Sequence, residues 1–271
     1  MPKRLSRGDR RALKLSAEEL ESRSLKPETV KQAVEQIRVN GYVVFEGVLP
    51  EDKVNALHES FMQVFEAHIA NNPLNRGKNR TQMNVPFIEP FNDPDVITHP
   101  FVLPVVEELL GRNCACRYFA SDTPLPGSEY QLVHSDLQAL YPDSSVILPT
   151  TGIVLNIPLV DFREDNGPLE IWPGGTHLMP ENANRVENLQ LLAPVMHSEP
   201  VLMPAGSLLL RDIRMWHRGT PNRSDAARPN MALVYFRSWF NTESKVRIPL
   251  KSYESLSERA KQLFRFEEIV N

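Results

Sequence analysis

The chain has 271 residues, of which 41% are hydrophobic, and this is enough for one large domain with a substantial core. A charged fraction of 24% is ordinary for a globular protein, and a formal net charge of -4 argues against a general nucleic-acid binder, which normally presents a basic surface. No apolar stretch reaches the roughly 20 residues that span a bilayer, so we expect neither a nucleic acid nor a membrane as partner.

The first 25 residues are basic at their start, and we expect residues 1–25 to form a flexible, solvated tail. They lack the apolar core of a secretory signal, although their arginine content is compatible with an organellar transit segment. Cys114 and Cys116 are too few for a disulfide scaffold, and a bridge between positions i and i+2 of a strand is geometrically awkward. Two reduced thiols indicate a cytoplasmic protein.

The first part of the chain has helical patterning. Apolar residues at helical spacing predict a helix over 27–40, which ends at Asn-Gly, and a short β-type run over 42–45 follows. A longer helix begins at Pro50, with apolar residues every three or four positions. Residues 71–94 are rich in Asn, Pro and basic residues without periodicity, so we expect an irregular segment that can cover a pocket. Another helix, interrupted by prolines, is expected over 93–111.

After this point short β-type runs separated by turn signals replace the helices. These runs cover residues 114–120, 129–134, 152–159, 169–172, 207–210 and 230–240. Helices followed by many strands predict a mainly β protein with flanking helices: a jelly-roll or cupin-like barrel, or double-stranded β-helix, buttressed by the N-terminal helices. A parallel α/β sheet is the alternative, weakened because no amphipathic helices separate the late strands. A last helix is expected near 254–266, and residues 26–271 should form a single domain.

The residues that carry chemistry begin in the run from Tyr130 to Asp136, whose alternation is typical of an extended strand. Side chains at i and i+2 of a strand leave the same face, so His134 and Asp136 should point into one space. If the fold brings His217 to them, two imidazoles and one carboxylate form the facial triad of non-haem Fe(II) oxygenases. His217 follows a strand and lies in a loop with Gly and Pro, where site residues are common, although a buried core histidine is the alternative.

Arg228 follows His217 at the start of the last β-type run. A dicarboxylate that chelates iron with one end needs its far carboxylate held, and a planar guanidinium does this with two parallel hydrogen bonds. Arg223 and Arg237 are the competing candidates. Without the triad, Arg228 would be interpreted as a surface cation in a polar loop.

His134-Ser135-Asp136, His217 and Arg228 together resemble the motif of the phytanoyl-CoA dioxygenase family of Fe(II)/2-oxoglutarate oxygenases. Asn166–His177 is similar to the Asn-Gly and Pro-Gly-Thr-His segment of that family, and the resemblance covers roughly residues 30–240. Residues 158–162 and 211–222 are similar to antibiotic-tailoring members. This favours a small-molecule substrate from natural-product biosynthesis.

The resemblance implies that the triad binds Fe(II) and that Arg228 holds the distal carboxylate of the co-substrate 2-oxoglutarate. O2 would be the oxidant, and succinate and CO2 would be released. Gln131 and Asn156 match positions that line the co-substrate in members of the family, although either side chain also fits an ordinary polar role in a sheet.

Three residues refine this comparison. Gly219 departs from the family pattern, because several members have there a Ser that helps to bind the co-substrate carboxylate. Asp136 separates the chain from related halogenases, which have Gly or Ala at this position, so hydroxylation or another oxidation is expected. His177 follows a Gly-Gly turn and could complete an alternative triad with His134 and Asp136, but the equivalent His in relatives is mostly structural.

We expect residues 71–94, the loop 137–149 and the aromatic residues Tyr141, Trp239 and Phe240 to shape the substrate cavity, although each also fits core or lid packing. Two rival functions remain open: a metal-dependent hydrolase or isomerase on the same barrel, and a non-catalytic barrel that binds small molecules. The sequence is compatible with a homo-oligomer and does not identify the substrate.

Overall fold

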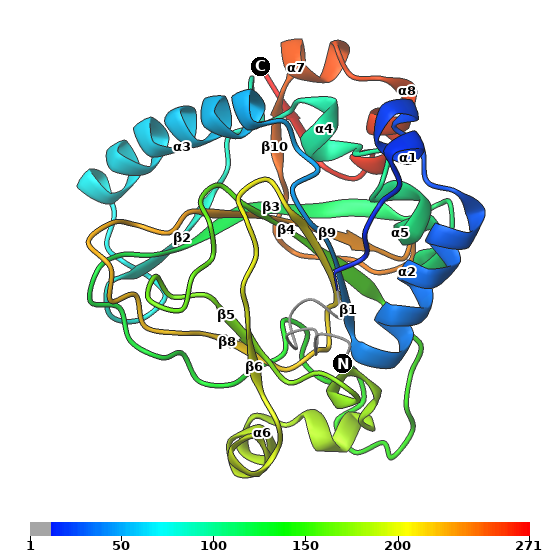
Figure 1. Ribbon diagram of the computed structural model, residues 1–271, viewed down its shortest axis with the longest axis vertical. Helices are drawn as coiled ribbons and strands as arrows, with labels where there is room; N and C mark the ends of the chain where they lie inside the picture. The colour runs from blue at the N-terminus through cyan, green and yellow to red at the C-terminus, as the bar shows by residue number, and fades with distance from the viewer. Residues whose placement is uncertain (1–11) are drawn as a thin grey trace, which may run out of the picture.

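The computed structural model describes residues 12–271, and its centre is a six-stranded antiparallel sheet in the order β1-β7-β4-β9-β3-β2 (Figure 1). Its strands are β1 (Tyr42–Phe45), β2 (Arg80–Asn84), β3 (Ala115–Pro124), β4 (Gly152–Pro158), β7 (Leu208–Asp212) and β9 (Asn230–Phe236). A three-stranded antiparallel sheet in the order β6-β5-β8 packs against the β1 and β7 side of the large sheet through a small apolar cluster. Its strands are β5 (Leu169–Ile171), β6 (Glu199–Val201) and β8 (His217–Gly219).

Two facing sheets with helices outside one of them confirm the predicted mainly β, jelly-roll architecture. Antiparallel pairing throughout both sheets excludes the parallel α/β alternative.

The two faces of the large sheet have different chemistry, and β4 shows why. Alternate side chains of a strand point to opposite faces. Ile153, Leu155 and Ile157 belong to the main apolar core, whereas Val154 and Asn156 line a cavity on the other face. The sheet is therefore buried by helices on one side and open toward the small sheet on the other.

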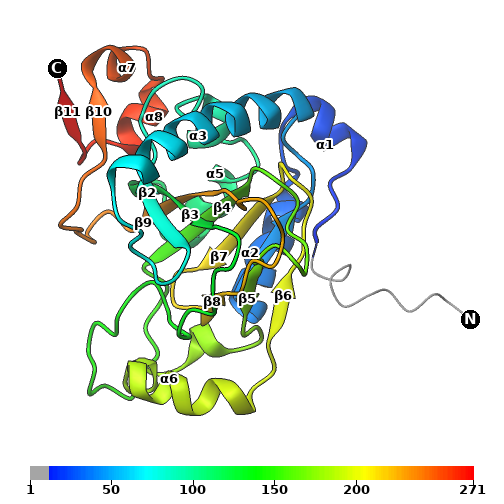
Figure 2. The same ribbon diagram turned by 90° about the vertical axis from the view of Figure 1, so that its left-hand side faces the viewer.

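The helices α2, α3, α4 and α5 contribute side chains to the core on one side of the large sheet, and α1 lies next to them (Figures 1 and 2). Their bounds are α1 (Ala17–Ser22), α2 (Pro27–Asn40), α3 (Glu51–Asn71), α4 (Pro94–Ile97) and α5 (Leu103–Leu110). The predicted helices over 27–40 and from Pro50 are confirmed, and the prolines divide the helix expected over 93–111 into α4 and α5.

Three expectations from the sequence need correction. Residues 12–25 are not a tail: the backbone N–H of Leu13 donates to the carbonyl of Val44 in β1, and Ser16 with Glu19 forms a capping box that starts α1. The rest of the expected tail, residues 1–11, lies outside the described residues. The irregular segment 71–94 contains β2, where buried Thr81 and Met83 alternate with polar side chains.

The end of the chain also differs from the expectation. The helix expected near 254–266 is instead α7 (Leu250–Glu254) and α8 (Glu258–Leu263), because Ser257 caps a new helix by accepting from the backbone N–H of Ala260. The strands β10 (Arg247–Pro249) and β11 (Glu268–Val270) pair in parallel beside them. A further helix, α6 (Val186–Leu192), lies near the small sheet and carried no clear signal in the sequence.

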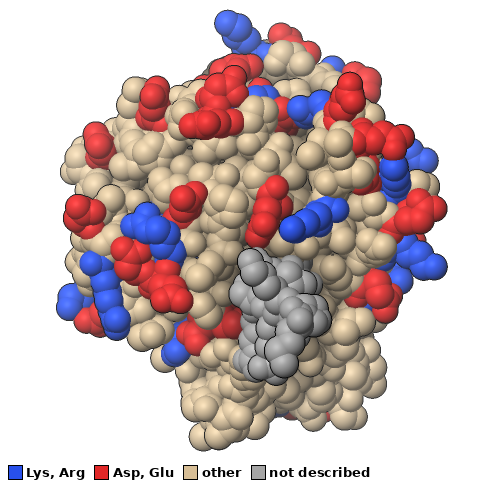
Figure 3. All heavy atoms as spheres, viewed as in Figure 1, with Lys and Arg blue, Asp and Glu red and all other residues tan. Residues whose placement is uncertain are grey.

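Cys114 and Cys116 are both buried and unpaired with each other, which confirms two free thiols. Among the described residues, no helix is long and apolar enough to cross a membrane. On the face seen in Figure 3, basic and acidic side chains are interspersed rather than separated by sign.

Candidate active site

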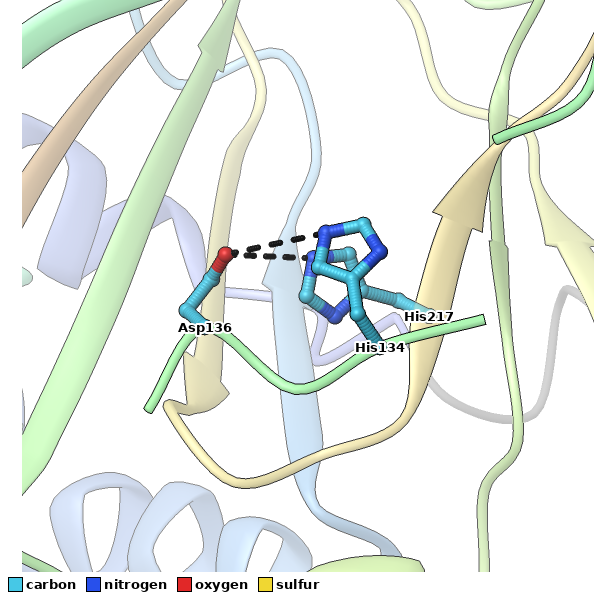
Figure 4. Close-up of side chains that lie close together, drawn as sticks. All are labelled: His134, Asp136 and His217. Atoms are coloured by element: carbon cyan, nitrogen blue, oxygen red, sulfur yellow. Dashed lines mark ion pairs between the residues drawn. The ribbon is translucent and has the colours of Figure 1, made fainter. Parts of the chain in front are cut away.

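The fold brings His134, Asp136 and His217 together, as Figure 4 shows. The Nε2 atom of His217 lies 3.4 Å from Oδ1 of Asp136, and the Nε2 atom of His134 lies 4.0 Å from the same oxygen. One candidate donor atom from each residue lies within 4.8 Å of the other two. This spacing suits a single ion bound by two imidazoles and one carboxylate, with the remaining positions open.

Backbone pairing aligns the two histidines. His134 and His217 form an isolated antiparallel bridge, with backbone hydrogen bonds of 3.0 and 2.9 Å in both directions. The strand expected over 129–134 is therefore not formed as a regular strand. The segment is an extended loop whose backbone pairs with β8 only at Gln131 and His134. Even so, His134 and Asp136 point into one space, as predicted from their spacing.

Each imidazole is oriented through its second nitrogen. The Nδ1 atom of His134 donates to the carbonyl of Leu132 at 2.8 Å, and that of His217 donates to the carbonyl of Met215 at 2.9 Å. These hydrogen bonds leave both Nε2 lone pairs free to bind a metal, as in most protein metal sites. Burial, together with the neighbouring His217, lowers the pKa of His134 to about 4, so this ring is neutral and able to coordinate at pH 7.

The carboxylate of Asp136 is held by a buried arginine of β7. Arg211, 4% exposed, donates from Nη2 to Oδ2 of Asp136 and from Nε to Oδ1 of Asn156 at 3.2 Å. Burial tends to raise the pKa of Asp136, but Arg211 and then His217 hold it well below the usual range. Because Oδ2 is occupied, Oδ1 is the oxygen that faces the two imidazoles.

Replacing Arg211 with Gln should weaken Fe(II) binding by about 10–100-fold, the usual effect of removing a group that orients a ligand. Isothermal titration with Fe(II) under anaerobic conditions measures it. Arg211→Lys should recover part of the loss, because an ammonium can still pair with Asp136. Equal metal affinity in the wild type and both variants would show that Arg211 does not support the carboxylate.

The three residues lie in a cavity of about 380 Å³ between the two sheets. One side is apolar: Val154, Ile213 and Val234 form a cluster with Phe236. The other side is polar and cationic, and Arg228 lies within it. The polar wall includes Gln82, Asp122, Gln131, Asn156, Arg211, Arg228 and Asn230.

Arg228 fits the predicted role of anchor for a carboxylate. It is 2% exposed, its guanidinium lies 4.2 Å from the ring centroid of Phe162, and its only nearby carboxylate among the described residues is Asp122 at 3.8 Å. Its Nε atom has no hydrogen-bond partner within the described chain, and the same holds for Oδ1 of Asn230. Burial lowers the pKa of Arg228 to about 9, although the negative charge of Asp122 acts to raise it. A second carboxylate would supply the missing partner, so the residues present fit a dicarboxylate.

Gln131 and Asn156, which the resemblance places beside the co-substrate, both line the cavity. Oε1 of Gln131 accepts from the backbone N–H of Gly219 at 2.9 Å, and Asn156 contacts Arg211. Both side chains therefore also support the site framework. Of the competing arginines, Arg223 is exposed, and Arg237 donates to carbonyl groups at the C-terminal end of α5.

The aromatic residues expected in the substrate cavity are only partly there. Tyr141 and Trp239 are 63% and 64% exposed and do not belong to the cavity wall, because both lie in turns that direct them outward. Phe240 stacks on Phe236 with centroids 4.7 Å apart, so it supports the apolar wall from behind. His177 is not part of a triad: its Nε2 atom donates to the carbonyl of Arg38 at 2.9 Å.

Local sequence patterns did not point to Asp122 and Arg211, which line the cavity, or to Arg80, which pairs with Asp122. All three lie on strands of the large sheet and face the cavity side. A signal was present in Leu208–Asp212, where an arginine follows three leucines in a buried strand. A buried charge needs a partner, so such an arginine predicts a carboxylate nearby.

Known proteins similar to this chain were found by family model and by structure. A family model described as Phytanoyl-CoA dioxygenase (PhyH) matches residues 37–230, which include the triad and Arg228. Among solved structures, the chain is similar to the non-heme alpha ketoglutarate dependent carbocyclase SnoK from nogalamycin biosynthesis, with a TM-score of 0.60 and 20% identity over 79% of this chain and 84% of that chain.

The chain is also similar to the non-heme alpha ketoglutarate dependent epimerase SnoN from nogalamycin biosynthesis, with a TM-score of 0.61 and 20% identity over 78% of this chain and 84% of that chain. A structure of SnoN in complex with Fe3+, alpha ketoglutarate and nogalamycin RO gives a TM-score of 0.61 and covers 85% of that chain. At this identity the likeness establishes the fold.

The family model spans more than half of the chain, and the enzyme class predicted from the sequence, an Fe(II)/2-oxoglutarate-dependent oxidoreductase, is confirmed with it. The chain therefore belongs to the phytanoyl-CoA dioxygenase family.

Proposed function

We propose that this protein is an Fe(II)/2-oxoglutarate-dependent dioxygenase that hydroxylates a small molecule of natural-product biosynthesis. The observation that carries the proposal is the convergence of Nε2 of His134, Nε2 of His217 and Oδ1 of Asp136 in one cavity with the buried Arg228. In a cluster that only stabilises the fold, buried polar atoms are expected to have hydrogen-bond partners. Here the Nε2 atoms of His134 and His217 face the cavity, and Nε of Arg228 has no hydrogen-bond partner within the described residues.

The residues of this chain bind and orient. His134, Asp136 and His217 would hold the metal on one side, and Arg228 would hold the distal carboxylate of 2-oxoglutarate. When bound, iron and 2-oxoglutarate supply the oxidising power toward O2, with succinate and CO2 released. Arg211 keeps Asp136 ionised and aimed by its contact with Oδ2.

The apolar wall supports the choice of a small organic substrate. Val154, Ile213 and Val234 pack beside the triad, and the ring of Phe236, which stacks on Phe240, extends this wall. Such a wall excludes water from the side where a C–H bond would approach the metal. SnoK, a carbocyclase, and SnoN, an epimerase, have similar folds and act in natural-product biosynthesis. In this chain Asp136 favours hydroxylation over halogenation.

Anaerobic titration with Fe(II) and then 2-oxoglutarate tests this function. We expect a visible metal-to-ligand charge-transfer band in the wild type, because 2-oxoglutarate chelates through its 1-carboxylate and 2-keto oxygens. A screen for succinate release against candidate small molecules then identifies the substrate. Metal-dependent activity without the band and without succinate would support a hydrolase or isomerase. If the protein binds no metal and no 2-oxoglutarate, that result would support a non-catalytic barrel.

A further inference from the structure

Two buried arginines share one carboxylate at the polar end of the cavity. Arg80 of β2 is 1% exposed and donates from Nη1 to Oδ2 of Asp122 at 2.8 Å. Arg228 approaches the same oxygen with Nη2 at 3.8 Å. Asp122 lies on the cavity wall with its side chain 35% exposed. The group therefore carries two positive charges and one negative charge.

Gly219 makes room for this arrangement. A Cβ atom at position 219 would lie 2.4 Å from Cζ and from Nη1 of Arg80, so any side chain there would displace the guanidinium. Nη2 of Arg80 donates to the carbonyl of Thr220 at 2.8 Å, which fixes the guanidinium beside β8. The space beside Gly219 is therefore filled by an arginine from another strand.

The contacts around Asp122 are unequal. Its hydrogen bond with Arg80 has ordinary length, whereas 3.8 Å to Arg228 is too long for a hydrogen bond. Nε of Arg80 and Nε of Arg228 both have no hydrogen-bond partner within the described chain. One additional negative charge would balance the group, and the cavity gives it access to Arg228.

We propose that Asp122 sets the affinity of the distal carboxylate site by competing with the co-substrate for Arg228, and that Arg80 limits this competition by holding Asp122 to one side. The inference rests on the proposed function and concerns residues outside the triad. A bound dicarboxylate faces repulsion from Asp122, which weakens its binding. Succinate keeps the same distal carboxylate, so the repulsion also favours release of the product.

Substitutions of Asp122 and of its partner Arg80 should change co-substrate affinity in opposite directions. Asp122→Asn removes the competing charge but keeps an oxygen that can accept from Arg80, so the affinity for 2-oxoglutarate and for succinate should rise about tenfold. Arg80→Met frees Asp122 to pair with Arg228, so both affinities should fall by a similar factor. The double variant should return to or exceed the affinity of the wild type.

Affinities are measured anaerobically in the Fe(II)-loaded protein, from the charge-transfer band for 2-oxoglutarate and by competition for succinate. Asp225→Asn, a change of an exposed carboxylate in the loop before Arg228, serves as control and should leave both affinities unchanged. Thermal unfolding of each variant identifies loss of structure, and the rescue in the double variant distinguishes competition from damage.

Unchanged or weaker binding in a folded Asp122→Asn protein would overturn the inference while leaving the proposed function intact. Failure of the wild type to bind 2-oxoglutarate would overturn the proposed function and this inference together. A loss in Arg80→Met that the second substitution does not restore would show that Arg80 has a structural role only.

Discussion

Replacing His217 with Ala should lower Fe(II) affinity and 2-oxoglutarate turnover by more than about 1,000-fold, beyond the roughly 10–100-fold effect typical of residues that only support a ligand. The change removes one of the three donors that we propose bind a single ion. The two remaining donors, His134 and Asp136, come from one loop and occupy only one side of the site. Anaerobic metal titration and succinate release measure the two losses separately.

His197→Ala is the matched control, because His197 is 54% exposed and its imidazole contacts only Glu199 among carboxylates of the described residues. This variant should bind Fe(II) like the wild type. Full metal affinity in His217→Ala would refute the triad, and the rival candidate His177 is already held by the carbonyl of Arg38.

Arg228→Met should raise the KM for 2-oxoglutarate by roughly 30-fold to several thousand-fold, which corresponds to about 2–5 kcal/mol for the loss of one partner of a buried charge pair. Binding of Fe(II) should change little, because Arg228 is not a metal ligand. The protein should still fold, since Asp122 keeps its 2.8 Å hydrogen bond with Arg80. Succinate release measured over a range of 2-oxoglutarate concentrations gives the KM.

Arg223→Met provides the comparison, because Arg223 is an exposed arginine in the same loop. It should leave the KM unchanged. An increase of less than about threefold in Arg228→Met would mean that another group holds the distal carboxylate. In that case Arg80 would be the next candidate, because it is the other arginine that contacts Asp122.

The local parts of the fold followed from local patterns. The end of α2 was predicted at Asn40-Gly41 because glycine favours the left-handed conformation that ends many helices. Gly41 adopts this conformation, with φ of 89°. The strand β2 has no β-type pattern because Met83 is its only apolar residue in the core, while Gln82 lines the cavity and Asn84 is exposed. The split between α7 and α8 depends on one serine cap, which a long amphipathic pattern obscures.

The candidate donors were predicted from sequence alone: a histidine and a carboxylate two residues apart, a later histidine, and an arginine beyond it. The sequence determined their chemistry because side-chain type and spacing fix which lone pairs and charges are available. The pairing of His217 with His134 became visible only in the folded chain, as did the contacts that bring Arg211, Arg80 and Asp122 to the site from separate strands. Contacts between strands far apart in the chain depend on sheet register, and local periodicity carries no information about register between such strands.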